Sequence, residues 1–190
     1  MKRLLLSLFV LCVTLSVNAQ YRDVKLPDKP KQTSYKDYEK EDAGFWYAIE
    51  AEGGSSIMAQ HTNMQYVNLS FVGGYRFSEF LRLGAGAGGR MYVNHASIRD
   101  TDNKFGVPIF ANVRGNLISA YDQDGVPFWS LNIGGITNEG VFASPSVGCS
   151  FGGLRNNFQI SLSYTISSFT DYTKTKQAYS YVALKLGYEF

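Results

Sequence analysis

Side chains alternate between apolar and polar along most of the chain from Phe45 to the last residue. In the clearest stretch, residues 157–166, one face carries Phe, Ile, Leu, Tyr and Ile, and the other carries only Asn, Gln, Ser and Thr. A period of two predicts a β-strand with two chemically different faces. The pattern recurs in eight segments, each near the roughly 9–11 residues that a tilted strand needs to cross a bilayer. These segments begin near Phe45, Val67, Leu81, Val107, Phe128, Ala143, Asn157 and Tyr181.

The connections between these segments alternate in length. Brief turns fall around residues 78–80 and 152–156, and longer polar connections around 95–104 and 168–178. The turn around 119–125 is longer than this scheme requires, and the loop at 136–141 is shorter. Short turns on one side and long loops on the other are typical of membrane-spanning barrels, whose even number of strands returns both ends to one side. We therefore expect an all-β fold, an eight-stranded antiparallel up-and-down transmembrane β-barrel.

The polar face distinguishes a membrane barrel from a soluble barrel or sandwich. A soluble barrel keeps its apolar side chains inside and presents many Lys, Glu, Asp and Arg residues to water. Here the polar face consists mainly of Gly, Ser, Asn and Thr with scattered charges. Such a face suits the narrow, crowded interior of an eight-stranded barrel. We expect the apolar faces to contact lipid and the polar faces to fill the lumen.

The first 44 residues differ from the rest of the chain. Residues 1–19 read as a signal peptide, with Lys2 and Arg3, an apolar run from Leu4 to Leu15, and a cleavage site of small residues ending at Ala19. Cys12 lies too far inside the apolar run for a lipoprotein signal. Residues 20–44 are rich in charge and lack periodicity, which predicts a flexible, disordered arm. The barrel is expected over residues 45–190.

Composition excludes several classes of protein. Without Lys2 and Arg3, the 18 basic residues fall to 16, which equals the 16 acidic residues, so no nucleic-acid partner is indicated. Only Cys149 remains after cleavage, so no internal disulfide can form. After the signal peptide, no apolar run approaches the roughly 20 residues of a membrane helix.

Strand parity places eight charged side chains on the inner face. Buried charges persist when they are paired and hydrogen-bonded, so we predict an internal charge network that plugs the lumen. Glu50 and Lys185 are expected to pair, because the first and last strands must meet to close the barrel. The predicted network comprises Glu50, Glu52, Arg76, Arg82, Arg90, Arg114, Lys185 and Glu189.

The stretch RLGAGAGGR, residues 82–90, satisfies the glycine pattern of a dinucleotide-binding turn. That turn must open a helix, whereas here β-forming residues follow. We predict a barrel strand whose inward glycines, Gly84, Gly86 and Gly88, make room for Arg82, Arg90 and residues from opposite strands.

The chain ends in YVALKLGYEF, with Val182, Leu184, Leu186, Tyr188 and Phe190 on alternate positions. This ending resembles the closing-strand signal that the barrel-assembly machinery recognises, although Lys185 stands where that signal often has glycine. With the signal peptide and the strands, residues 45–190 resemble the small eight-stranded outer-membrane β-barrel family of Gram-negative bacteria. The resemblance implies contact with outer-membrane lipid and lipopolysaccharide, and an N-terminal arm and C-terminus in the periplasm. The family includes structural, adhesive and lipid-modifying members, so it does not fix the activity.

Candidate sites outside the lumen are few. His95 and Ser97 resemble the His-x-Ser arrangement of lipid A deacylases, with Glu139 as the acidic candidate on a separate loop. His61 and His95 lack a second metal ligand at useful spacing, and Cys149 is expected to face lipid, so we expect no metal site and no cofactor. Clustered aromatic residues at the periplasmic boundary form a predicted interfacial girdle, among them Phe45, Phe77, Trp129, Tyr188 and Phe190.

A non-enzymatic role follows as the main expectation, either structural or through loops that bind an unidentified ligand. Residues 95–104 and 167–178 are the polar loops that best suit binding. A lipid A-modifying enzyme and a narrow solute channel remain as alternatives.

Overall fold

The computed structural model describes residues 43–57, 64–94, 104–120, 125–137, 140–152, 156–170 and 176–190. Residues 1–42, which hold the predicted signal peptide and nearly all of the predicted arm, lie outside this set. The described residues form nine strands: β1 (Gly44–Ser56), β2 (Gln65–Ser78), β3 (Leu81–Asn94), β4 (Phe105–Gly106), β5 (Pro108–Asn116), β6 (Gly125–Ile136), β7 (Gly140–Gly152), β8 (Asn157–Thr170) and β9 (Lys176–Glu189).

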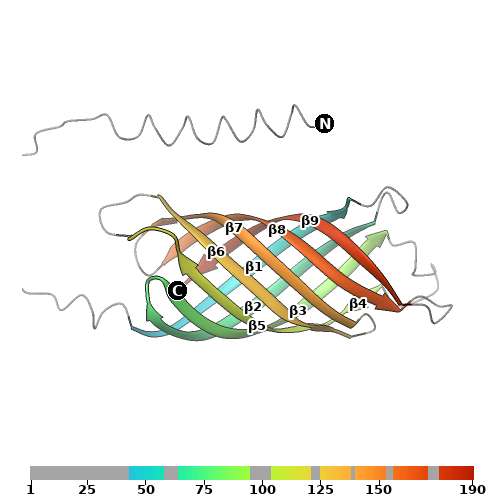
Figure 1. Cartoon of the computed structure of the whole chain (residues 1–190), viewed down its shortest axis with the longest axis horizontal. Helices are drawn as coiled ribbons and strands as arrows, with labels where there is room; N and C mark the ends of the chain where they lie inside the picture. The colour runs from blue at the N-terminus through green and yellow to red at the C-terminus, as the bar shows by residue number, and fades with distance from the viewer. Residues whose placement is uncertain are drawn as a thin grey trace, which may run out of the picture. The chain divides into compact units, whose positions relative to one another are not determined.

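These strands close into a barrel (Figure 1). They pair antiparallel in the order β2-β1-β9-β8-β7-β6-β5-β3-β4, and an additional pairing of β2 with β3 completes the ring. β4 and β5 both pair with β3 and are separated only by Val107, so they are two pieces of one interrupted strand. The barrel therefore has eight strand positions, which confirms the predicted architecture.

Most strands are longer than the alternation alone predicts. β1 has 13 residues and continues past Glu52, where its alternation ends, to Ser56, which pairs with Tyr181 of β9. β2, β3, β8 and β9 each have 14 residues. Backbone pairing extends beyond the segments with clear alternation, because the ladder needs only N–H and C=O groups.

The apolar faces point outward and the polar faces point inward, as predicted. Leu69 and Leu184 are 59% and 50% exposed on the outer surface, whereas Glu50 and Arg90 in the lumen are only 3% and 1% exposed. Exposing such an outer surface to water would raise the free energy by roughly 25 cal/mol for each Å² of apolar area. Contact with lipid carries no such penalty. The barrel wall is therefore suited to a bilayer. No helix in the described ranges is long and apolar enough to span a membrane.

The glycine-rich run of residues 82–90 lies entirely within β3, as predicted. A Cβ added at Gly84 would lie 3.0 Å from Cζ2 of Trp46, and one at Gly86 would lie 2.6 Å from Cζ of Phe110. The side chains nearest to these two glycines are thus aromatic rings from β1 and β5. The predicted room for residues from other strands thus goes to these two rings.

The two ends of the barrel differ in what they contain. We call the end where β1 begins and β9 finishes the terminal end, because Ala48 pairs with Glu189 there. The turn between β2 and β3 and the start of β8 lie at the same end. Phe45, Tyr75 and Phe77 form edge-to-face ring pairs on its outer surface, with centroids 5.6 and 5.1 Å apart. The side where β1 leads into β2 is the opposite end.

Candidate functional site: the barrel lumen

Glu189 is the centre of a charge cluster at the terminal end, and it is completely buried. Nη1 of Arg82 lies 2.6 and 2.7 Å from its two carboxylate oxygens, and Nη2 of Arg76 donates to Oε1. Nη1 of Arg114 lies 3.6 Å from Oε2, and Nε2 of Gln159 donates to the same oxygen at 3.0 Å. We call Glu189, Arg76, Arg82 and Arg114 the Glu189 cluster. It connects the last strand to β2, β3 and β5 across the lumen.

Arg114 joins this cluster to a second acid, Glu50 of β1. Its Nη2 lies 2.5 Å from Oε1 of Glu50, while its Nε donates to Oδ1 of Asn112 at 2.8 Å. The guanidinium carbon also lies 4.4 Å from the ring centroid of Trp46, within cation–π range. Lys185 of β9 places its Nζ 3.5 Å from Oε2 of Glu50. Each acid therefore faces at least two cations, which offsets the cost of removing its charge from water.

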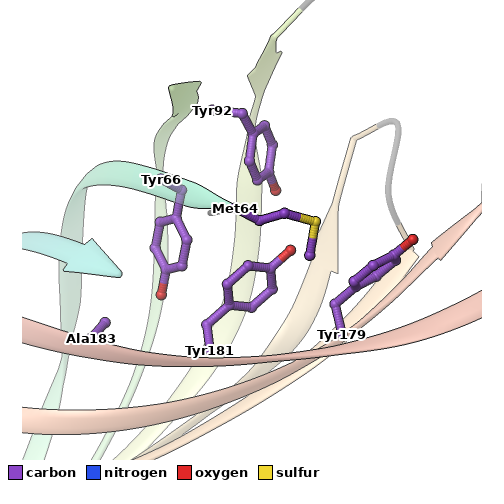
Figure 2. Packing of buried hydrophobic residues seen from close by; sticks show 6 residues of the cluster. All are labelled: Met64, Tyr66, Tyr92, Tyr179, Tyr181 and Ala183. Carbon is purple, nitrogen blue, oxygen red and sulfur yellow. The ribbon is translucent and has the colours of Figure 1, made fainter. Parts of the chain in front are cut away.

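Buried aromatic side chains gather in the lumen at the opposite end (Figure 2). Met64 extends among tyrosine rings that come from β2, β3 and β9. The ring centroids of Tyr66 and Tyr181 are 5.3 Å apart, and those of Tyr66 and Tyr92 are 6.5 Å apart, both at edge-to-face angles. All members are at most 4% exposed. We call this group the tyrosine cluster: Met64, Tyr66, Tyr92, Tyr179 and Tyr181.

Two charged residues, Glu52 and Arg90, contact Tyr66 of the tyrosine cluster. The hydroxyl of Tyr66 donates to Oε1 of Glu52 at 2.7 Å, and Ser163 donates to the same oxygen at 2.8 Å. The guanidinium carbon of Arg90 lies 4.2 Å from the Tyr66 ring centroid and 5.6 Å from that of Phe142. Tyr66 is therefore held by a hydrogen bond at its hydroxyl and a cation against its ring.

The wall formed by β6, β7 and β8 contributes small hydroxyl side chains. Ser130 and Ser146 share a hydrogen bond of 2.6 Å, and Ser144 and Thr165 share one of 2.8 Å. A second buried apolar cluster comprises Trp46, Ala48, Val72, Phe110, Ile136 and Phe142. Every strand position of the described barrel thus contributes buried side chains to the lumen, and many of their polar atoms bond to one another.

The eight charged residues predicted for the lumen all lie inside the barrel, with exposed fractions of 0–5%. The structure brings Arg76, Arg82, Arg114 and Glu189 together at the terminal end and places Glu52 and Arg90 near the tyrosine cluster. Sequence reasoning missed the tyrosine cluster itself. It also missed Asn116, which accepts a hydrogen bond from Arg82.

Other predicted residues occupy the outer surface or lie outside the described set. Those of the closing strand face outward and are 41–50% exposed: Val182, Leu184, Leu186, Tyr188 and Phe190. Cys149 is exposed on the same side of the wall. The structure does not describe His61, His95, Ser97 or Glu139, so the deacylase-like arrangement has no geometry to report.

Comparisons with known proteins bear on the fold. No family model matches the chain, and no curated protein matches it in sequence. Among solved structures, Neisserial surface protein A (NspA) matches with a TM-score of 0.53 and 15% identity, over 77% of this chain and 97% of that one. A de novo designed transmembrane β-barrel matches at 0.42 and 12% identity, covering 76% of this chain and 95% of its own. The outer membrane protein OprG from Pseudomonas aeruginosa matches at 0.41 and 11% identity, over 78% and 97% of the two chains.

The similarity to NspA extends over nearly all of that protein, and it agrees with the closed ring of eight strand positions and the outward apolar faces. This chain therefore has the fold of a small, closed, eight-stranded antiparallel β-barrel, as NspA does.

Proposed function

We propose that this protein is a non-conducting outer-membrane barrel with a structural or loop-mediated binding role in the bacterial envelope. Residues 1–19 direct export, and residues 20–44 and the C-terminus lie in the periplasm. The observation that supports the proposal is that two buried side-chain clusters lie inside the barrel, one toward each end. The Glu189 cluster occupies the terminal end, and the tyrosine cluster occupies the opposite end.

A filled lumen leaves the outer wall and the loops as the surfaces for function. The wall contacts membrane lipid and lipopolysaccharide, and the loops at the opposite end are carried on a rigid frame. Binding residues are common on loops that a rigid scaffold positions. The closing strand, with Phe190 at its end, serves as the recognition element for the barrel-assembly machinery.

Planar-bilayer recording of the purified protein tests the absence of conduction. We expect no steps comparable with those of a large porin recorded under the same conditions as the positive control. Stable porin-like conductance would contradict the proposal and favour the channel alternative.

Cell fractionation tests the membrane location separately. We expect the protein in the outer-membrane fraction, with release only by detergent. Recovery from the soluble fraction without detergent would exclude the membrane assignment.

A further inference from the structure

A small cavity of about 10 Å³ lies among buried polar side chains at the terminal end of the lumen. Three connections of the barrel meet around it, because its lining comes from the turn between β2 and β3, the connection between β5 and β6, and the ends of β7 and β8. A cavity of this size holds one water molecule or one small ion. Its charged and amide-bearing lining residues are Arg76, Glu79, Arg82, Asn116 and Asn157.

The two amide side chains are oriented by their neighbours. Oδ1 of Asn116 accepts a hydrogen bond from Nη2 of Arg82, and Oδ1 of Asn157 accepts one from Nε2 of Gln159 at 2.9 Å. The other polar group of each amide is Nδ2, which can only donate. Two amide donors therefore join two guanidinium groups in the cavity lining.

Arg82 brings a buried donor that the described residues do not satisfy. This side chain is 4% exposed, and its two terminal nitrogens donate to Glu189 and Asn116. Its buried Nε has no hydrogen-bond partner among the described residues. Leaving a buried charged donor without an acceptor is costly, so the cavity favours a ligand that accepts hydrogen bonds.

The buried charges around the cavity do not balance. Four positive charges stand against three negative ones, which leaves one positive charge in excess among the described residues of this network. One monovalent anion restores neutrality, and buried charge persists only where it is compensated. The cations are Arg76, Arg82, Arg114 and Lys185, and the acids are Glu50, Glu79 and Glu189.

We infer that this cavity is a binding site for a single chloride ion. A halide carries one negative charge, accepts hydrogen bonds from several directions and is only slightly larger than a water molecule. Phosphate and sulfate, with four oxygens each, are too large for this volume. A water molecule in the same place would satisfy Nε of Arg82 but leave the excess charge uncompensated. The bound chloride links β3, β5 and β8 through Arg82, Asn116 and Asn157.

Crystals of the full-length protein grown with sodium bromide in place of chloride locate the ion directly. Bromide scatters X-rays anomalously near its absorption edge, whereas water does not. We expect one anomalous peak in the cavity, within hydrogen-bonding distance of Nε of Arg82. Density in the cavity without an anomalous signal would identify a water molecule and overturn the site.

Chloride NMR of the protein in an uncharged detergent measures binding in solution. Exchange of chloride with a protein site broadens its resonance, and bromide that competes for the same site narrows it again. We expect saturable broadening that bromide reverses and that gluconate at the same ionic strength does not.

Two matched substitutions separate the site from a general effect of charge. Glu79→Gln removes a negative charge from the cavity lining and keeps an oxygen that can accept from the N–H of Ala120. We expect this variant to bind chloride about tenfold more tightly or better, because a neighbouring carboxylate repels an anion. Glu52→Gln removes the same charge about 13 Å along β1 from Ala48, the residue that pairs with Glu189. Its affinity should change by less than about threefold, since repulsion falls with distance.

Each contrary result overturns the site for a distinct reason. Broadening that bromide and gluconate reverse equally would show that the salts act only through ionic strength. An unchanged affinity in Glu79→Gln, with the variant folded, would show that chloride binds away from this cavity. A bromide peak in the cavity without saturable binding in solution would mean binding at crystal concentration only.

Discussion

At the scale of single residues, Glu189 lies against three arginines, Arg76, Arg82 and Arg114. Glu189→Gln keeps the size of the side chain and removes its charge, so Arg76 and Arg82 lose their shared acid. Removing one partner of a buried ion pair typically costs about 3–5 kcal/mol, because the remaining charge stays desolvated. We expect a loss of this size in the free energy of unfolding, measured by urea titration of the refolded protein in vesicles.

The matched control for this prediction removes a cation together with the acid. Glu189→Gln combined with Arg82→Gln leaves less uncompensated charge, so the double variant should be less destabilised than the two single changes added together. Additive losses would show that Glu189 and Arg82 do not depend on one another.

Neighbouring glycines test the packing of the tyrosine cluster. A Cβ at Gly54 would lie 2.5 Å from Cε1 of Tyr66, so Gly54→Ala must displace that ring from Glu52 and Arg90. Overpacking of this kind costs about 1–3 kcal/mol. A Cβ at Gly53 would meet nothing within 4 Å, so Gly53→Ala should leave the urea midpoint nearly unchanged. Equal effects of the two changes would contradict the packing described.

At the scale of strands, the interruption between β4 and β5 has a specific support. The N–H of Val107 donates to Oγ1 of Thr137 at 2.8 Å, and the N–H of Thr137 donates to the carbonyl of Val107 at 3.1 Å. Thr137→Val removes the hydroxyl acceptor, and a lost hydrogen bond is worth about 1 kcal/mol. We expect the Val107 amide to exchange hydrogen roughly fivefold faster, and Thr137→Ser to keep the original rate. An unchanged rate in Thr137→Val would show that water replaces the hydroxyl without cost.

The strands themselves could be predicted from the sequence. Apolar and polar side chains alternate with a period of two wherever one face of a strand lies on the apolar outer surface and the other faces the lumen. Parity then placed Glu50, Glu189 and the other charged residues on the inner face without knowledge of any contact. The interruption at Val107 was not predicted, although Pro108 directly after it lacks an N–H for the ladder. The hydrogen bond of Val107 to Thr137, some 30 residues away, has no local signal in the sequence.

The tyrosine cluster was missed for a related reason. Tyr66 and Tyr179 continue the inner parity of their strands but lie just outside the segments with clear alternation, so they were not counted as lumen residues. Their shared position depends on the stagger of β2 against β9, which only the closed barrel defines.

At the scale of the whole molecule, the proposed non-conducting role makes the Glu189 cluster and the tyrosine cluster two blocks in series along the lumen. Ions must pass both, so removing one block leaves the resistance of the other. Tyr66→Ala with Tyr181→Ala empties space at the opposite end, and Arg82→Ala with Arg76→Ala does so at the terminal end. We therefore expect neither pair alone to conduct measurably in a planar bilayer, and the four changes together to give discrete current steps.

The folded state of each variant must be established first, by its heat-dependent shift in electrophoresis, because truncations in the lumen also create cavities that destabilise. A folded tyrosine variant that conducts as well as the fourfold variant would show that the Glu189 cluster does not block ions. The opposite result, full conduction by the arginine variant alone, would remove the tyrosine cluster as a barrier. Resistances in series add, so two independent blocks require that only the fourfold variant, with both pairs of side chains truncated, conducts.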